Sequence, residues 1–143
     1  WKLGFRKEQG LEEISIPVVI VGAGVLLPGF SHHGVKEIAE VKKRYPKHAV
    51  VVSLMVESKD EWKDIIKRSI DAGGDGLELN FGCPHGMCER GMGSAVGQEP
   101  KVNEKITAWA KEFSTIPVLV KLTPNVGDIL PHGLAAQAGG GGG

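Results

Sequence analysis

The segment from Leu77 to Pro100, LELNFGCPHGMCERGMGSAVGQEP, gathers side chains that are well suited to chemistry. It places Cys83, His85 and Cys88 in a C-x-H-x-x-C pattern inside a glycine-rich stretch, directly after an apolar run. Thiols and imidazoles bind metals and transfer protons, whereas the backbone N–H groups of glycine-rich loops can bind phosphate. The segment is therefore a candidate metal site, phosphate site or acid/base loop.

A zinc site is the first alternative. Cys83, His85 and Cys88 supply three suitable ligands, but a structural zinc site needs a fourth. The sequence contains no further cysteine, and its remaining histidines do not have the paired spacing of a zinc-binding module. We therefore expect no metal at this loop.

A phosphate-binding loop is the second alternative. Gly86, Gly91, Gly93 and Gly97 would let backbone N–H groups approach an anion, yet no G-K-[ST] sequence accompanies them. Glycines spread in this way are more typical of a loop that bends and moves as a lid. The pattern therefore favours a mobile loop over a phosphate cradle.

An acid/base loop is the third alternative, and these residues favour it. A thiol has an unperturbed pKa of about 8.5, so near neutral pH it can donate a proton to carbon or, as a thiolate, remove one. Pro84 stiffens the turn behind Cys83, and Asn80 offers a donor and an acceptor to an amide-like ligand. A long loop without secondary structure is uncommon in a compact domain unless it has a function, which argues against an incidental surface loop.

The elements that must position this loop alternate between strands and helices. The predicted strands span residues 48–56, 76–80 and 116–124, and the first of them is continuously apolar and rich in β-branched residues, as a strand buried on both faces should be. The predicted helices span residues 34–44, 59–72 and 101–113, with Ser58 as the N-cap of the second, and a further helix begins near Asp128. Such alternation predicts an α/β fold with parallel strands, either a doubly wound sheet or part of a (β/α)₈ barrel.

Each predicted helix carries an apolar stripe that should face the sheet. The inward positions are Val35, Ile38, Ala39 and Val41, then Trp62, Ile65, Ile66 and Ile70, and finally Val102, Ile106, Trp109 and Phe113.

In both architectures the carboxyl ends of neighbouring parallel strands meet at one mouth. The group formed by Asn80, Cys83 and His85 should therefore lie near the group that follows the next strand. The second group comprises Lys121, Thr123 and Asn125.

The composition limits the classes of function and partner. Lys plus Arg and Asp plus Glu each number 17, so no net positive field attracts nucleic acid. No apolar run reaches the roughly 18 residues that a membrane helix needs, and the amino-terminal sequence has no signal-peptide pattern. Two cysteines in one loop exclude a disulfide framework. We expect a cytoplasmic protein with neither nucleic acid nor membrane as a partner.

The two ends of the chain are less informative. Within the unassigned residues 1–34, Gly22 and Gly24 follow an apolar run, as in a dinucleotide-binding fingerprint. The third fingerprint position is Leu27 instead of Gly or Ala, and Pro28 follows where a helix should continue, so a simple strand and turn is expected. Residues 139–143 are expected to be a glycine tail that packs against nothing, and the chain reads as a piece of a longer one.

The loop and the next strand end together resemble one enzyme family. The sequence ELNFGCPHGMCERGMGSAVGQ, followed by VKLTPNVGDI, is similar to the flavin-binding barrel of the dihydropyrimidine dehydrogenases, within the dihydroorotate dehydrogenase-like superfamily. The resemblance covers roughly residues 35–138. It implies part of a (β/α)₈ TIM barrel, with about three to four of its eight β/α units.

The resemblance also implies a reaction, the reduction of the 5,6 double bond of uracil or thymine in pyrimidine catabolism. FMN would deliver hydride to C6, and Cys83 would act as the general acid that protonates C5 from the opposite face. Asn80 would bind the amide edge of the pyrimidine, and His85, also in the substrate-binding set, would order the loop. Lys121 would bind the flavin and stabilise its reduced anion. Dihydroorotate oxidation on the same barrel and an inactive, incomplete fragment are the alternatives.

Electrons would have to come from elsewhere. The sequence contains no iron–sulfur cysteine cluster and no pyridine-nucleotide domain, so the resemblance implies NAD(P)H and iron–sulfur clusters on another domain or subunit. Cys88 stands where the family is expected to have a residue without a thiol. A disulfide between Cys88 and Cys83 on oxidation would lock the loop.

Overall fold

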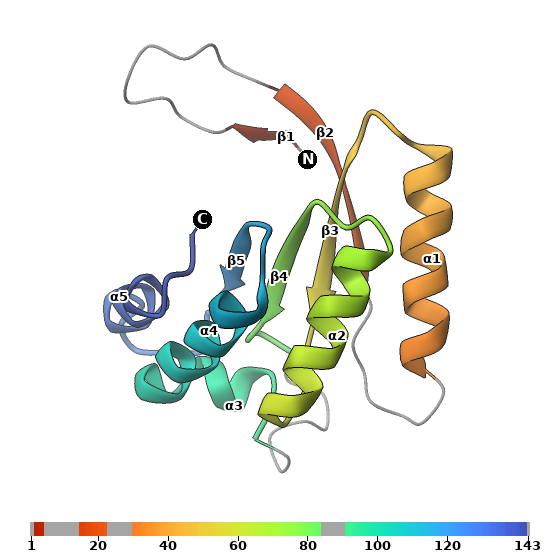
Figure 1. The fold of residues 1–143 in the computed structure, drawn as a ribbon. Helices are drawn as coiled ribbons and strands as arrows, with labels where there is room; N and C mark the ends of the chain where they lie inside the picture. The colour runs from red at the N-terminus through yellow and green to blue at the C-terminus, as the bar shows by residue number, and fades with distance from the viewer. Residues whose placement is uncertain (1, 5–14, 23–29, 84–90, 143) are drawn as a thin grey trace.

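The computed structural model describes residues 2–4, 15–22, 30–83 and 91–142, which form a sheet covered by helices (Figure 1). The strands are β1 (Lys2–Gly4), β2 (Ser15–Gly22), β3 (Ala49–Leu54), β4 (Gly76–Asn80) and β5 (Val118–Lys121). The helices are α1 (Phe30–Arg44), α2 (Lys59–Asp71), α3 (Ser94–Gly97), α4 (Pro100–Phe113) and α5 (Leu130–Ala138). None of these helices is both long and apolar enough to span a membrane.

The sheet adds its strands in chain order. Its order is β1-β2-β3-β4-β5, in which β2 to β5 pair in parallel and β1 pairs with β2 antiparallel. The long helices follow the same order, since α1 contacts α2, α2 contacts α4 and α4 contacts α5 (Figure 1). A doubly wound sheet would reverse its strand order and carry helices on both faces. The predicted α/β fold is confirmed, with the sequential winding of a barrel segment.

The helices bury one face of this sheet. Alternate residues of the strands, among them Val50, Val52, Leu77 and Leu79, have no exposed surface and belong to one cluster with residues of α1, α2 and α4. The intervening residues point to the other face because side chains alternate along a strand. The face away from the helices can therefore carry polar side chains.

Local sequence signals set the ends of α2. The Ser58 side chain accepts a hydrogen bond from the Glu61 N–H, and the Glu61 carboxylate accepts one from the Ser58 N–H, which completes the predicted cap as a capping box. Gly73 follows the helix with a φ of +97°, in the left-handed region that favours glycine. The predicted strands enclose β3, β4 and β5, whereas α1 begins at Phe30, before the predicted residue 34.

Two inward positions predicted from the apolar stripes are wrong. Ala39 is exposed on α1, and Val102 is exposed in the first turn of α4. The buried stripe of α4 includes Asn103 and Thr107 instead. The Thr107 hydroxyl donates to the Asn103 side-chain oxygen, and the Asn103 amide donates to the backbone carbonyl of His132 on α5. These hydrogen bonds offset the cost of burying polar groups, which a hydrophobic pattern does not register.

The glycine run after α5 packs against the sheet, so the expectation of a tail that packs against nothing is wrong for residues 139–142. Gly139 is buried, and a Cβ there would meet the Glu104 carbonyl oxygen at 2.6 Å. Gly142 donates its N–H to the Val118 carbonyl oxygen and forms a parallel bridge beside Leu119. Glycine is required where the backbone approaches its neighbours this closely.

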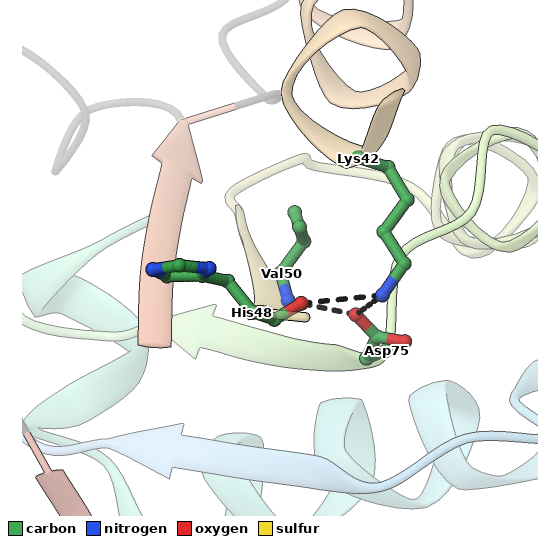
Figure 2. Close-up of polar contacts among 4 residues, drawn as sticks. All are labelled: Lys42, His48, Val50 and Asp75. Carbon is green, nitrogen blue, oxygen red and sulfur yellow. Dashed lines mark hydrogen bonds and ion pairs between the residues drawn. The ribbon is translucent and has the colours of Figure 1, made fainter. Parts of the chain in front are cut away.

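Asp75 joins the amino-terminal ends of β3 and β4 to the end of α1 (Figure 2). Its Oδ2 accepts hydrogen bonds from the Val50 N–H at 2.8 Å and from Lys42 Nζ at 2.5 Å, and Lys42 also donates to the His48 carbonyl oxygen. The Asp75 N–H donates in return to the Val50 carbonyl oxygen. In a barrel this end of the strands contributes to stability, because the chemistry lies at the opposite end.

Replacing Asp75 by alanine is expected to lower the free energy of unfolding by about 1–2 kcal/mol. The reason is that the buried N–H of Val50 loses an acceptor and Lys42 loses its counterion. Asp75→Asn, which keeps an acceptor oxygen, should recover part of the loss. Urea unfolding followed by circular dichroism measures both effects.

The matched control for this prediction is Asp71→Ala. Asp71 pairs with Lys67 on the exposed surface of α2, where the hydrogen bond and the charge of the carboxylate raise the pKa of Lys67. Exposed pairs of this kind contribute little to stability, so we expect no measurable change. Equal losses in the Asp75→Ala and Asp71→Ala variants would contradict the role given to Asp75.

Candidate active site

The pairing of β4 with β5 brings the predicted polar residues together. Asn80 and Lys121 are direct partners in this parallel ladder, and they are the last residues of their strands. Partners in register point to the same face of a sheet. The Phe81 N–H donates to the Lys121 carbonyl oxygen at 3.1 Å and extends the pairing beyond the strands. The prediction that the two groups meet at one mouth is confirmed for Asn80 and Lys121.

A carboxylate that the sequence interpretation missed lies beneath this mouth. Glu78 Oε1 accepts a hydrogen bond from Ser53 Oγ at 2.9 Å and forms an ion pair with Lys121 Nζ at 3.0 Å. The Glu78 side chain is 13% exposed and that of Lys121 is 48% exposed. Ser53, Glu78 and Lys121 come from β3, β4 and β5, so the contacts cross three adjacent strands. The sequence feature that could have identified Glu78 is a charged residue at the centre of the strand GLELN, two positions before Asn80 and therefore on the same face of the sheet.

Asn80 is oriented by its own backbone. Its Oδ1 accepts a hydrogen bond from the Gly82 N–H at 3.3 Å, a local turn that asparagine commonly forms at a strand end. The Nδ2 group has no hydrogen-bond partner within the described part of the chain. Asn80 can therefore offer amide donors to a ligand at this mouth.

The backbone at Cys83 is held where the loop leaves the strand. Its carbonyl oxygen accepts a hydrogen bond from the Ser94 N–H at 3.0 Å, so the two stems of the loop are joined. Gly93 makes this approach possible, because a Cβ there would lie 2.5 Å from the Cys83 carbonyl oxygen, and its φ of +57° also favours glycine. The Cys83 thiol is free and partly exposed. The structure thus fixes the base of the loop that carries the predicted proton donor.

The helix α3 lies inside the segment that was expected to lack secondary structure, and that expectation is wrong for residues 94–97. A Cβ on Gly97 would lie 2.1 Å from the Phe81 carbonyl oxygen and 2.9 Å from Thr123 Cγ2, so α3 packs against the ends of β4 and β5. Thr123 is buried, and its Oγ1 accepts a hydrogen bond from the Asn125 N–H. Thr123 and Asn125 therefore shape the end of β5.

The remaining predictions for this loop concern residues outside those that the structure describes. His85, predicted to bind substrate and order the loop, lies in residues 84–90, as does Cys88. Within the residues that the structure does describe, no group of three or more His, Cys, Asp or Glu side chains is arranged to hold a metal ion. The described site consists of Ser53, Glu78, Asn80, Cys83 and Lys121.

Known proteins are similar to this chain in sequence. Dihydropyrimidine dehydrogenase (NADP(+)), chloroplastic, of Arabidopsis thaliana is 44% identical over 95 residues, covering 66% of this chain and 22% of that protein. NAD-dependent dihydropyrimidine dehydrogenase subunit PreA of Escherichia coli K12 is 40% identical over 103 residues, covering 72% and 25%. Dihydroorotate dehydrogenase B (NAD(+)), catalytic subunit, of Methanosarcina acetivorans is 39% identical over 114 residues, covering 80% and 36%.

The chain thus spans between 22% and 36% of the length of these relatives. The family model described as Dihydroorotate dehydrogenase matches residues 18–141. This match begins in β2, so it extends the resemblance towards the amino terminus and includes every parallel strand of the sheet. The chain belongs to the dihydroorotate dehydrogenase family.

Proposed function

We propose that this chain carries the catalytic loop of an FMN-dependent dihydropyrimidine dehydrogenase, which reduces the 5,6 double bond of uracil or thymine. The observation that carries the proposal is the pairing of Asn80 with Lys121, beside the loop stem at Cys83. Two relatives named dihydropyrimidine dehydrogenase, at 44% and 40% identity, support this substrate class.

The residues at the mouth fit a bound flavin in their chemistry. Lys121 places a half-exposed ammonium group at the end of β5, and a fixed cation there stabilises negative charge on a bound group. Asn80 adds amide donors that have no other partner among the described residues. When bound, FMN supplies the hydride that reduces C6 of the pyrimidine.

Cys83 is the proposed general acid. Its Sγ would transfer a proton to C5 of the pyrimidine, so that hydride and proton together saturate the double bond. The hydrogen bond between the Ser94 N–H and the Cys83 carbonyl oxygen holds the loop stem, which limits how far the thiol can move from the mouth. Asn80 would hydrogen-bond the amide edge of the substrate and fix its orientation.

An electron-donating partner completes the proposal. The Escherichia coli relative is named a subunit of an NAD-dependent enzyme, and the Methanosarcina relative is named a catalytic subunit. We infer that NAD(P)H and iron–sulfur clusters are held by another domain or subunit, from which electrons reach the flavin.

Dihydroorotate oxidation is the second candidate function. It is favoured by the family match and by the Methanosarcina relative, which is 39% identical over 80% of this chain. In that reaction the Cys83 thiolate would act as a base and remove a proton from dihydroorotate, instead of donating one.

Flavin absorbance of the FMN-loaded enzyme separates the two functions. Uracil or thymine should reoxidise the reduced flavin, and the corresponding dihydropyrimidines should bleach the oxidised flavin. Bleaching by dihydroorotate together with silence towards dihydropyrimidines would instead assign the second function. The third alternative, an inactive fragment, is tested by titrating the purified 143-residue chain with FMN, and stoichiometric binding would rule against it.

A further inference from the structure

We propose that Glu78 is a positioning residue, which holds the Lys121 ammonium at the mouth and sets the net charge beside the flavin. This inference rests on the proposed function, because it concerns how residues of this chain affect the reduction of a bound FMN. It adds two residues, Glu78 and its hydrogen-bond donor Ser53, to a site that otherwise consists of Asn80, Cys83 and Lys121.

The geometry of Glu78 supports a positioning role. The register pairs Ser53 with Glu78 directly, and Lys121 lies two residues beyond Leu119, the partner of Glu78 on β5. Glu78 Oε1 therefore has two partners. It accepts a hydrogen bond from the Ser53 hydroxyl at 2.9 Å and forms an ion pair with Lys121 Nζ at 3.0 Å. A carboxylate with a 13% exposed side chain cannot rely on water for solvation, so its charge depends on these partners.

The ammonium group keeps capacity for a ligand. A lysine ammonium has three donors, and Glu78 is the only partner that Lys121 Nζ has within the described residues. The pair is asymmetric, because the Lys121 side chain is 48% exposed whereas Glu78 is mostly covered. Glu78 thus restrains the lysine from the inside of the sheet while the remaining N–H groups are available at the mouth.

The charges of this pair predict how it tunes a flavin. Reduction of a flavin to its anion is favoured by a nearby cation and disfavoured by a nearby anion. Lys121 and Glu78 therefore act in opposite directions, and together they contribute no net charge. Removing only the carboxylate should favour the reduced flavin, and removing only the ammonium should favour the oxidised flavin.

Redox titration of the holoenzyme tests this inference with four variants. At a fixed potential, Glu78→Gln should raise the ratio of reduced to oxidised FMN at least roughly tenfold, and Lys121→Met should lower it at least roughly tenfold, as expected for one charge within about 12 Å at an effective dielectric constant of about 20. The double variant should return to within about threefold of the wild type, because the pair is removed as a neutral unit. Glu78→Asp, which keeps the charge, should also stay within about threefold.

The control is a second Glu–Lys pair, which joins two of the helices that cover the other face of the sheet. Glu112 on α4 pairs with Lys59 on α2 at 2.8 Å, with both side chains about half exposed, so Glu112→Gln should leave the flavin potential unchanged. Glutamine at position 78 can still accept a hydrogen bond from Ser53, so we expect the Glu78→Gln variant to fold. A lower melting temperature of Glu78→Gln with an unchanged potential would mean a purely structural role and would overturn the inference. Failure of the wild type to bind FMN would overturn the proposed function instead.

Discussion

Replacing Cys83 by alanine in the FMN-loaded enzyme is expected to lower the rate of uracil reduction by a factor of about 10²–10⁴, the usual contribution of a positioned general acid. The flavin should remain bound, because Lys121 and Asn80 do not depend on the thiol. Stopped-flow reoxidation of the reduced flavin by uracil measures the rate, and the flavin spectrum of the purified variant reports occupancy. Unchanged turnover would remove Cys83 from its proposed role.

The control for this prediction uses the other thiol of the loop. Cys88→Ser should retain activity under reducing conditions, since the proposed chemistry needs one proton donor. A comparable loss in this variant would mean that the role belongs to Cys88. Cys83→Ser should fall between alanine and the wild type, because a hydroxyl can donate a proton but is a much weaker acid than a thiol.

Replacing Gly97 by alanine is expected to lower the free energy of unfolding by about 3 kcal/mol and to reduce turnover as well. A Cβ at this position would lie 2.1 Å from the Phe81 carbonyl oxygen and 2.9 Å from Thr123 Cγ2. Because the nearest obstacle is backbone, α3 must move away from the strand ends. That movement would also displace the Ser94 N–H from the Cys83 carbonyl oxygen, and so misplace the thiol.

Urea unfolding and uracil turnover of Gly97→Ala provide the two measurements, with Gly127→Ala as the matched control. A Cβ on Gly127 would meet no atom within 4 Å, and its φ is not in the left-handed region, so this variant should behave like the wild type. Loss of stability with normal turnover in Gly97→Ala would show that the loop stem tolerates movement of α3. Equal effects in the two variants would contradict the packing argument.

The elements around the site could be predicted because their signals are local. Ser58 and Glu61 are close in the chain and can form a capping box without help from other elements, and Gly73 ends the same helix for a conformational reason of its own. The strand 76–80 was predicted with the bounds that the structure has. Asn80 and Lys121 could also be expected to meet, because each ends a strand and parallel strands end together.

Positions that depend on distant partners were predicted less well. Asn103 and Thr107 replace Val102 on the buried face of α4, because one hydrogen-bonds the other and Asn103 also reaches a carbonyl of α5. The glycines after α5 pack because their backbone lies against β5 and α4, a proximity that composition alone does not indicate. In both cases a contact distant in sequence changes the environment of the residue.

The sequence by itself therefore determined the fold class, the loop with its thiol and the strand ends that carry Asn80 and Lys121, since order along the chain is enough to define them. Only the tertiary structure decided which residues Glu78 contacts. Its partners Ser53 and Lys121 lie on separate strands, and the parallel register brings them to one carboxylate oxygen. The C-x-H-x-x-C loop thus begins beside a charged pair that no spacing within the loop could have predicted, because that pair depends on which residues face one another across the sheet.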